Sequence, residues 1–182
     1  MGDRANIVVL DPMIAFHGNP EIREFYLARI RGHMAADELE KGFYWEDGRG
    51  CGVGCTVHSG DHFAYERELG IPVQVAQIED AIFEALPNGE SKAWPERFLA
   101  AIPVGADLSR VWPEFAAWLM DDPTFGVAHA TDDAEIKELC LEVARRYRAG
   151  ETTGDEAAVL ADRLRAAWDA RDAWAARDAR DA

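Results

Sequence analysis

The apolar positions of this chain recur at spacings of three and four residues, which is the periodicity of amphipathic helices. We therefore predict a mainly α fold with helices over residues 20–41, 55–69, 73–86, 90–101, 107–120 and 132–149. These segments are bounded mostly by Pro or Gly, which commonly flank helices. The short apolar run at residues 5–16 fits a strand or a packed N-terminal arm equally well.

The first predicted helix has clear end signals and a polar extension of its apolar face. Asn19 suits the N-cap, Pro20 suits the first helical position, and Gly42 ends the segment. Its apolar face comprises Ile22, Phe25, Tyr26 and Ile30. Further steps of three and four residues along this face lead to His33 and Asp37. These two polar residues either bond each other at the helix end, emerge into solvent, or take part in a site.

Residues 151–182 differ in composition from the rest of the chain. They are rich in Ala and contain the tetrapeptide Ala-Arg-Asp-Ala at 170–173, 176–179 and 179–182. Ala and Arg favour helix, but the apolar content beyond Leu164 is thin. We predict a single helical domain at 1–150 and a projecting Ala-rich C-terminal helix at 151–182, through which the chain forms homo-oligomers if the tail packs against another subunit.

Charge and cysteine content narrow the classes of function. Asp and Glu number 34 against 19 Lys and Arg, so the net charge of −15 disfavours nucleic-acid binding and favours solubility or a basic partner. The sequence contains no run of 18 apolar residues, so we predict no membrane span, and the N-terminus lacks the features of a signal peptide. Three cysteines, an odd number, fit reduced thiols. We therefore expect a cytoplasmic protein.

Reactive side chains are concentrated between Cys51 and Glu66. If this segment were one helix, one face would carry Cys51, Cys55, His58, His62 and Glu66. A four-ligand zinc site from Cys51, Cys55, His58 and His62 does not fit a straight helix, because positions eleven residues apart are separated by roughly 16 Å. Zinc ligands must lie about 2.0–2.3 Å from the ion, so only neighbouring pairs can chelate one.

One hypothesis is a metal site, with zinc as the candidate ion and metal-bound water as the hydrolytic agent. His58 and His62 would be the first ligands, and the remaining ones would come from Cys51, His33, Asp37, His17 or Glu66. The glycine-rich loop at 50–54 permits Cys51 to fold back. The string from His58 to His62 also has the inverzincin spacing H-x-x-E-H, with Asp61 in the place of Glu.

A second hypothesis is thiol chemistry at Cys55. This residue sits where a helix N-terminus would lower the pKa of a thiol, and the glycine-rich loop offers N–H groups for an oxyanion. His58 or His62 would be the base, oriented by Asp61 or Glu66.

Both hypotheses describe a small enzyme or metal-binding protein that acts on an unknown small molecule or protein partner. The contrasting class is an acidic, non-catalytic interaction protein that binds a basic partner or assembles through its tail. A purely structural explanation is also open, because buried cysteines behave as small apolar residues and glycines make tight turns. The sequence lacks a P-loop, a complete Rossmann fingerprint, an H-E-x-x-H motif and an EF-hand loop, which disfavours nucleotide-dependent chemistry.

The stretch from about His17 to Leu119 resembles a group of uncharacterised bacterial proteins, above all in residues 44–62, Tyr-Trp-Glu-Asp-Gly-Arg-Gly-Cys-Gly-Val-Gly-Cys-Thr-Val-His-Ser-Gly-Asp-His. Members of that group often end in tails rich in Ala, Trp, Arg and Asp, as this chain does. The resemblance covers more than half of the chain and implies no particular activity.

Overall fold

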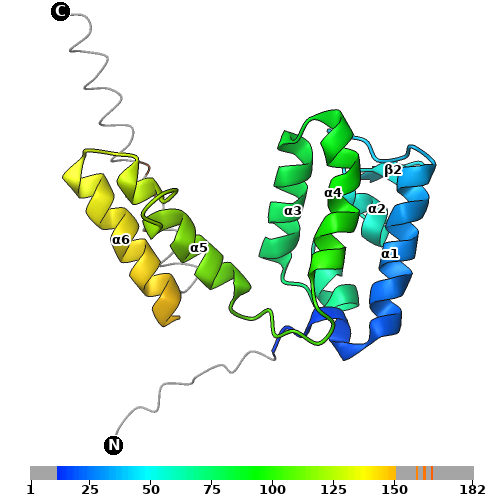
Figure 1. The fold of residues 1–182 in the computed structure, drawn as a ribbon, viewed down its shortest axis with the longest axis horizontal. Coiled ribbons are helices and arrows are strands. Elements are labelled where there is room, and N and C mark those ends of the chain that lie inside the picture. The colour runs from blue at the N-terminus through cyan, green and yellow to red at the C-terminus, as the bar shows by residue number, and fades with distance from the viewer. Residues whose placement is uncertain (1–11, 151–158, 160–161, 163–164, 166–182) are drawn as a thin grey trace, which may run out of the picture. The chain divides into compact units, whose positions relative to one another are not determined.

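The computed structural model describes residues 12–150 together with Val159, Asp162 and Arg165, and it confirms a mainly α fold (Figure 1). The α-helices are α1 (Pro20–Ala35), α2 (Gly52–Val57), α3 (Val73–Ala85), α4 (Asn88–Ala101), α5 (Val111–Asp121) and α6 (Ala134–Ala149). The shorter elements are the 3₁₀-helices η1 (Ala15–Gly18) and η3 (Val127–His129), the π-helix η2 (Tyr65–Leu69), and the strands β1 (Trp45–Glu46) and β2 (Arg49–Gly50).

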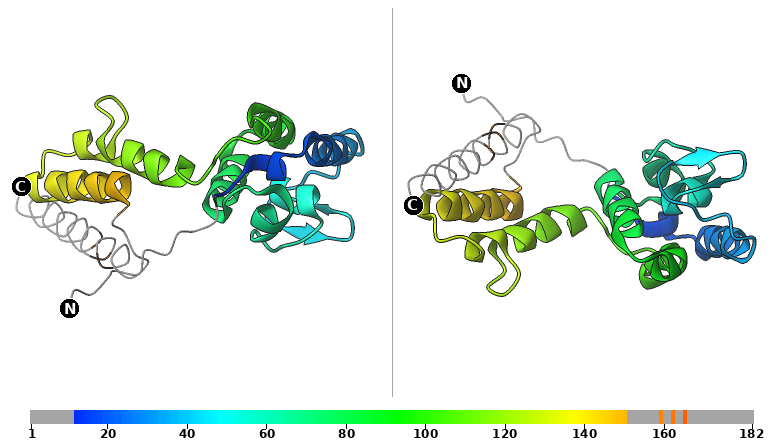
Figure 2. Two further views of the ribbon diagram at one scale, coloured as in Figure 1. Left: turned by 90° about the horizontal axis from the view of Figure 1, so that it is seen from below. Right: turned by 90° about the horizontal axis from the view of Figure 1, so that it is seen from above.

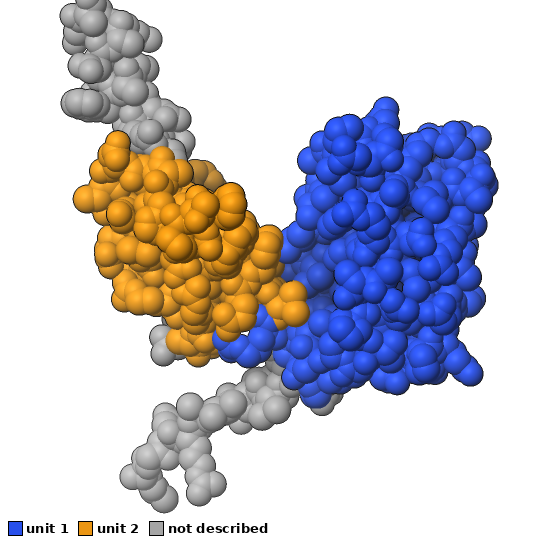
Figure 3. Space-filling view, in the orientation of Figure 1, with its two compact units in different colours: residues 1–110 blue, residues 111–182 orange. Residues whose placement is uncertain are grey.

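The chain divides into two compact units, residues 1–110 and residues 111–182, which Figure 3 shows in different colours. The boundary predicted at residue 150 separates a tail that lies outside the described residues, apart from the three isolated positions, so that boundary stays a prediction. The roles predicted for the tail, in self-assembly and in binding a basic partner, fall on the same residues.

Unit 1 is organised around the short helix α2. This helix contacts α1, α3 and α4, and all of its residues are buried (Figures 1 and 2). The largest fully buried side chains around it include Tyr65, Phe16, Phe83, Leu27, Ile30 and Leu39. Because α2 is enclosed on several sides, a residue at either of its ends is placed by contacts with other elements.

The β1–β2 hairpin lies directly on α2, and glycines make this possible. The hairpin turns through Asp47 and Gly48, whose φ angles of +48° and +86° fit a type I′ turn. A Cβ on Gly50 or on Gly54 would overlap the backbone carbonyl of Tyr44. Glycine is therefore required at both positions for close approach, and the glycine-rich loop has a packing role.

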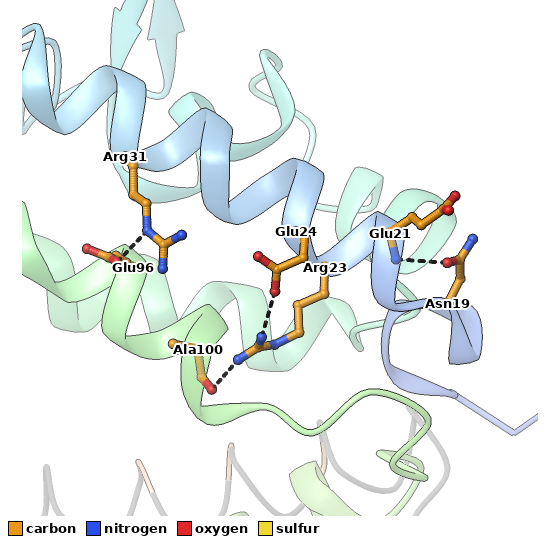
Figure 4. A network of polar contacts seen from close by, with 7 residues as sticks. All are labelled: Asn19, Glu21, Arg23, Glu24, Arg31, Glu96 and Ala100. Atoms are coloured by element: carbon orange, nitrogen blue, oxygen red, sulfur yellow. Dashed lines mark hydrogen bonds and ion pairs between the residues drawn. The ribbon is translucent and has the colours of Figure 1, made fainter.

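Helices α1 and α4 pair through polar contacts as well as apolar packing (Figure 4). The Arg31 guanidinium lies 2.6 Å from a Glu96 oxygen, and Arg23 donates to the backbone carbonyl of Ala100 at 2.8 Å. Asn19 accepts a hydrogen bond from the amide of Glu21 at 2.9 Å, which confirms it as the N-cap of α1, with Pro20 at the first helical position. Partly exposed pairs of this kind contribute little stability, on the order of 1 kcal/mol or less each.

Two helix predictions were wrong in extent. The helix predicted at 20–41 ends at Ala35, and Asp37 has a left-handed φ of +59°. The helix predicted at 55–69 is instead α2, a turn and η2, because the backbone at His58 is left-handed. The remaining predicted helices, at 73–86, 90–101, 107–120 and 132–149, match α3 to α6 with ends displaced by four residues or fewer.

The turn between α2 and η2 has a local chemical cause. The Ser59 hydroxyl accepts from the amide of Asp61 at 3.1 Å, and the Asp61 carboxylate accepts from the amide of Phe63 at 3.0 Å. Side chains of Ser and Asp that bond nearby amides compete with helix formation. The Ser-Gly-Asp sequence therefore ends the helix that periodicity alone would continue.

Unit 2 contains α5 and α6, which pack against each other and against η3. Its small core includes Ala128, Ile136 and Cys140. The carboxylate of Asp133 caps α6 by accepting from the amides of Glu135 and Ile136. In the described part of the chain, no helix is long and apolar enough to cross a membrane.

The N-terminal run at 5–16 is described only from residue 12 onward. Ile14 forms an isolated antiparallel bridge with Asp107, and η1 follows at once. Ala15 and Phe16 are fully buried. The described part of this run therefore packs into unit 1, as a single bridge followed by a 3₁₀ turn.

Candidate functional site

Four side chains of unit 1 form a group that we call the histidine cluster: His33, Glu38, Trp45 and His58. The Nε2 atoms of His33 and His58 are 2.8 Å apart, and the Nδ1 atom of His33 is 2.6 Å from a Glu38 carboxylate oxygen. The Trp45 indole stacks on the His58 ring with centroids 4.5 Å apart and planes 10° apart. Residues from α1, the following loop, β1 and the end of α2 thus converge at one place.

These contacts define the tautomers of the two imidazoles. A carboxylate only accepts, so His33 donates from Nδ1 to Glu38, and its Nε2 is then an acceptor in the neutral ring. His58 must therefore donate from Nε2 to His33, which leaves its own Nδ1 with a free lone pair. His58 is solvent-exposed, whereas the side chain of His33 is only 12% exposed. The cluster thus combines one exposed imidazole with one that is largely buried.

His58 occupies a backbone conformation that is unusual for a residue other than glycine. It is the C-cap of α2, with φ +53° and ψ +40°. A left-handed residue of this kind costs about 1–2 kcal/mol, and such strain is often found at functional sites. Burial, the Arg29 guanidinium and His33 together lower the pKa of His58. The ring is therefore neutral at neutral pH, the state in which Nδ1 accepts a proton.

A second group, which we call the acidic cluster, lies in the interior of unit 1 and comprises Cys51, Tyr65, Glu79 and Asp80. Glu79 is fully buried, and Cys51 is 1% exposed. Burial and then Asp80 raise the pKa of the Cys51 thiol well above its usual range. His62 lies at the edge of this cluster, with Nε2 3.6 Å from Asp80 and its ring edge-on to Tyr44. Cys51 and His62 therefore both lie near Asp80, whereas His58 belongs to the histidine cluster.

Cys55 does not occupy the position expected of a nucleophile. It is fully buried inside α2, and its thiol donates to the backbone carbonyl of Gly50 at 3.3 Å. Burial and the nearby Glu38 raise the pKa of Cys55 to about 12. A thiol with this pKa is almost entirely protonated at neutral pH and is a poor nucleophile.

The three carboxylates proposed from the sequence have other partners. Asp37 pairs with Lys92, whose hydrogen bond lowers the pKa of Asp37. Asp61 pairs with Arg67 at 2.8 Å, and that bond lowers the pKa of Asp61. Glu66 accepts from the amide of Val73 at 2.8 Å, at the start of α3. The partner in each of these contacts is a lysine, an arginine or a backbone amide, and none is a histidine or a cysteine.

The predicted metal ligands are divided between separate places. His33 and His58 meet, but Cys51 belongs to the acidic cluster, His62 lies at the edge of that cluster, and Asp37 faces Lys92. His17 lies with Nε2 3.2 Å from the carbonyl of Arg67. Within the described residues, no group of three or more His, Cys, Asp or Glu side chains is arranged to hold a metal ion. The single face expected for Cys51, Cys55, His58, His62 and Glu66 does not exist, because the helix ends at Val57.

Sequence reasoning missed Glu38 and Glu79, and only the second left a signal. Glu79 falls within the stripe Val75, Ala76, Glu79 and Phe83, so its position on the core-facing side of α3 follows from helical spacing. Glu38 follows α1 and carries no spacing relation to either histidine that distinguishes it from neighbouring acidic residues.

Comparisons with known proteins add no further constraint: no protein-family model, no curated protein and no solved structure matches this chain. Function must therefore be argued from the geometry of the two clusters.

Proposed function

We propose that unit 1 is a hydrolytic enzyme in which His58 is the general base and His33 and Glu38 form its proton relay. The observation that supports this most directly is the continuous run of hydrogen bonds from Glu38 through His33 to His58, at 2.6 Å and 2.8 Å. A base oriented by a second group, which is itself held by a carboxylate, is a recurring arrangement in acid–base catalysis.

In the proposed reaction, Nδ1 of His58 takes a proton from a water molecule as the water oxygen bonds to the electrophilic atom of the substrate. The Nε2 proton of His58 then moves toward Nε2 of His33, while Nδ1 of His33 keeps its proton and continues to donate it in a hydrogen bond to Glu38. Positive charge is thus shared across the pair beside a carboxylate. Return of the proton to the leaving group completes hydrolysis. General-base catalysis of this kind contributes about 10²–10⁴-fold to the rate.

The pKa of His58 sets the expected pH dependence. Because its pKa lies below the ordinary 6.5, His58 is deprotonated at neutral pH. Activity should therefore rise with pH through a value below 6.5 and then level off, as His58 loses its proton.

Zinc binding is the second candidate, and the same pair of histidines favours it. Two Nε2 atoms that face each other resemble two metal ligands, and the Glu38–His33 contact resembles the carboxylate that orients a ligating histidine. A tetrahedral zinc ion would require the two nitrogens to separate to about 3.3 Å, and catalytic zinc ordinarily has three protein ligands. The proton relay requires neither a wider separation of the two nitrogens nor a third ligand.

The test has one arm that requires no substrate. Nitrogen-15 NMR of the imidazoles should show His33 protonated at Nδ1 and His58 at Nε2 in the full-length protein at neutral pH. The opposite tautomer at either histidine would refute the relay. Addition of zinc should leave both signals unchanged, whereas loss of the His58 Nε2 proton on zinc addition would favour the metal site.

The second arm measures turnover. A panel of chromogenic carboxylic esters, phosphate esters and amides should include a substrate that wild-type protein hydrolyses about 10²–10⁴ times faster than His58→Ala. His129→Ala is the matched control, because His129 is exposed and lies in η3 of unit 2. Equal rates for wild type and His58→Ala across the panel would remove His58 as the base.

A further inference from the structure

Four buried side-chain oxygens in the described residues have no hydrogen-bond partner, and all belong to the acidic cluster. They are both carboxylate oxygens of Glu79, Oδ1 of Asp80 and the phenolic oxygen of Tyr65. Glu79 and Tyr65 are fully buried. Buried polar atoms are nearly always paired, because an unpaired one costs about 1–3 kcal/mol. Four such atoms in one place leave the acidic cluster without the partners that would stabilise an ionised carboxylate.

The surroundings of Glu79 leave little space for a large ligand. A Cβ on Gly52 would overlap a Glu79 carboxylate oxygen and would also meet the ring of Pro95. The indole of Trp94 donates to the backbone carbonyl of Glu79 at 3.0 Å, which anchors α3 to α4 but leaves the carboxylate unpaired. The carboxyl group is therefore pressed between the start of α2 and α4.

The titratable groups facing Glu79 are all acidic when they ionise. Asp80 comes from α3 itself, Cys51 and Cys55 from the N-cap and the body of α2, and Tyr65 from η2, while α4 contributes Trp94 and Pro95. No Lys, Arg or His pairs with Glu79 in the described part of the chain. An ionised carboxylate in such a place carries a very large desolvation penalty, and a proton removes it. Burial and then Asp80 raise the pKa of Glu79 well above its usual range.

We propose that Glu79 is a proton-binding site that holds α3 against α2, and that loss of its proton opens this contact and exposes Cys51. A proton fits the close packing at Gly52 and also neutralises a carboxyl group with no cation beside it. This inference is independent of the hydrolytic role proposed for His58, because the two clusters share no residue.

The direction of the pH effect follows from proton linkage. The folded state binds the Glu79 proton more tightly than the unfolded state, whose pKa is near the ordinary 4.5. Stability from this group is complete below that value and is lost as pH rises toward the raised pKa. Across that range, the unfolding equilibrium constant should increase about tenfold for each pH unit.

The first test compares chemical denaturation of the full-length wild type, Glu79→Gln and Glu90→Gln from about pH 5 to about pH 9. Gln has the shape of a neutral Glu but does not ionise, so Glu79→Gln should lose the tenfold-per-unit dependence on pH. Glu90 is exposed in α4, and Glu90→Gln should keep it. The same pH dependence in all three proteins would overturn the proposal.

The second test follows Cys51 directly. Alkylation of Cys51, located by peptide mass spectrometry and divided by the rate of free cysteine at each pH, should rise with pH in wild type and stay flat in Glu79→Gln. A flat normalised rate in wild type would refute the opening. Magnesium or zinc ions that stabilise wild type but not Glu79→Gln would show that the ligand is a metal ion and would also overturn the proposal.

A third measurement needs no variant. Infrared spectroscopy of wild type at neutral pH should show the carbonyl band of a protonated carboxyl group, since exposed Asp and Glu are ionised there. Absence of that band would refute a proton on Glu79, even if Glu79→Gln did not fold.

Discussion

The histidine cluster and the acidic cluster lie in the same unit and draw residues from the same short segment, but they satisfy their polar atoms in opposite ways. In the histidine cluster, a carboxylate and two imidazoles are joined by bonds of 2.6 Å and 2.8 Å, and one ring faces solvent. In the acidic cluster, four buried oxygens have no partner. The first arrangement keeps a nitrogen available for proton transfer, whereas the second suppresses ionisation.

Helix α2 separates these two environments. Cys51, at the N-cap of α2, belongs to the acidic cluster, and His58, at its C-cap, belongs to the histidine cluster. The two side chains at the ends of α2 therefore lie in opposite chemical environments. Four substitutions or measurements test this difference.

Alkylation of Cys55 tests whether burial in unit 1 keeps a thiol protonated. Its pKa of about 12, compared with about 8.5 for a free thiol, lowers the thiolate fraction on the order of 10³-fold. Alkylation of native Cys55 at neutral pH should therefore be about 10³ times slower than that of free cysteine. In denaturant, all three cysteines should react at the free rate. A native rate within about tenfold of free cysteine would contradict the suppression and revive thiol chemistry.

Gly54→Ala tests whether the packing of the hairpin on α2 supports the histidine cluster. The added methyl group would overlap the Tyr44 carbonyl, so chemical denaturation should show a loss of about 3 kcal/mol, and the Trp45–His58 stack should be disturbed.

Gly89→Ala is the matched control, because a Cβ there meets nothing within 4 Å in helix α4. This variant should keep or gain stability, by up to about 1 kcal/mol. Equal stabilities for the two alanine variants would mean that the close approach at Gly54 is not required.

Glu38→Gln tests the carboxylate end of the relay. Glu38 is a positioning residue, and its loss should lower the hydrolytic rate by about tenfold, as for other partners that orient a functional histidine. Because Glu38 raises the pKa of His58, the variant should also move the rise of the pH–rate profile to lower pH. Glu46→Gln, an exposed change in β1, should alter neither quantity. A slower rate with an unmoved profile would indicate a purely structural role.

Asp61→Asn should have the smallest effect. The Asp61 carboxylate bonds Arg67 and the amide of Phe63 and contacts no member of either cluster at hydrogen-bond distance. Asn retains an acceptor oxygen for the amide, and an exposed ion pair contributes little. The unfolding midpoint and the hydrolytic rate should both match wild type. A fall in the rate alone would restore Asp61 to the catalytic role predicted from its position beside His62.

Local signals in the sequence predicted the helices well, and the break after Val57 also had a local cause. The caps at Asn19 and Pro20 were found because N-cap chemistry acts within one turn. The break after Val57 was missed because periodicity was extended through Ser-Gly-Asp, whose side chains bond nearby amides. The turn chemistry of Ser59 and Asp61 is itself local, so the sequence carried enough information to exclude the single helical face.

The mainly α fold, the N-terminal signals of α1 and the concentration of thiols and imidazoles between Cys51 and Glu66 could be predicted from the sequence, because they depend on residues a few positions apart. Which of those side chains meet depends on the packing of the helices. His58 reaches His33, and Glu79 lies against Gly52, through the way that α1, α2, α3 and α4 pack. Such contacts join residues far apart in the chain, and neither helical spacing nor composition carries the distances that bring them together.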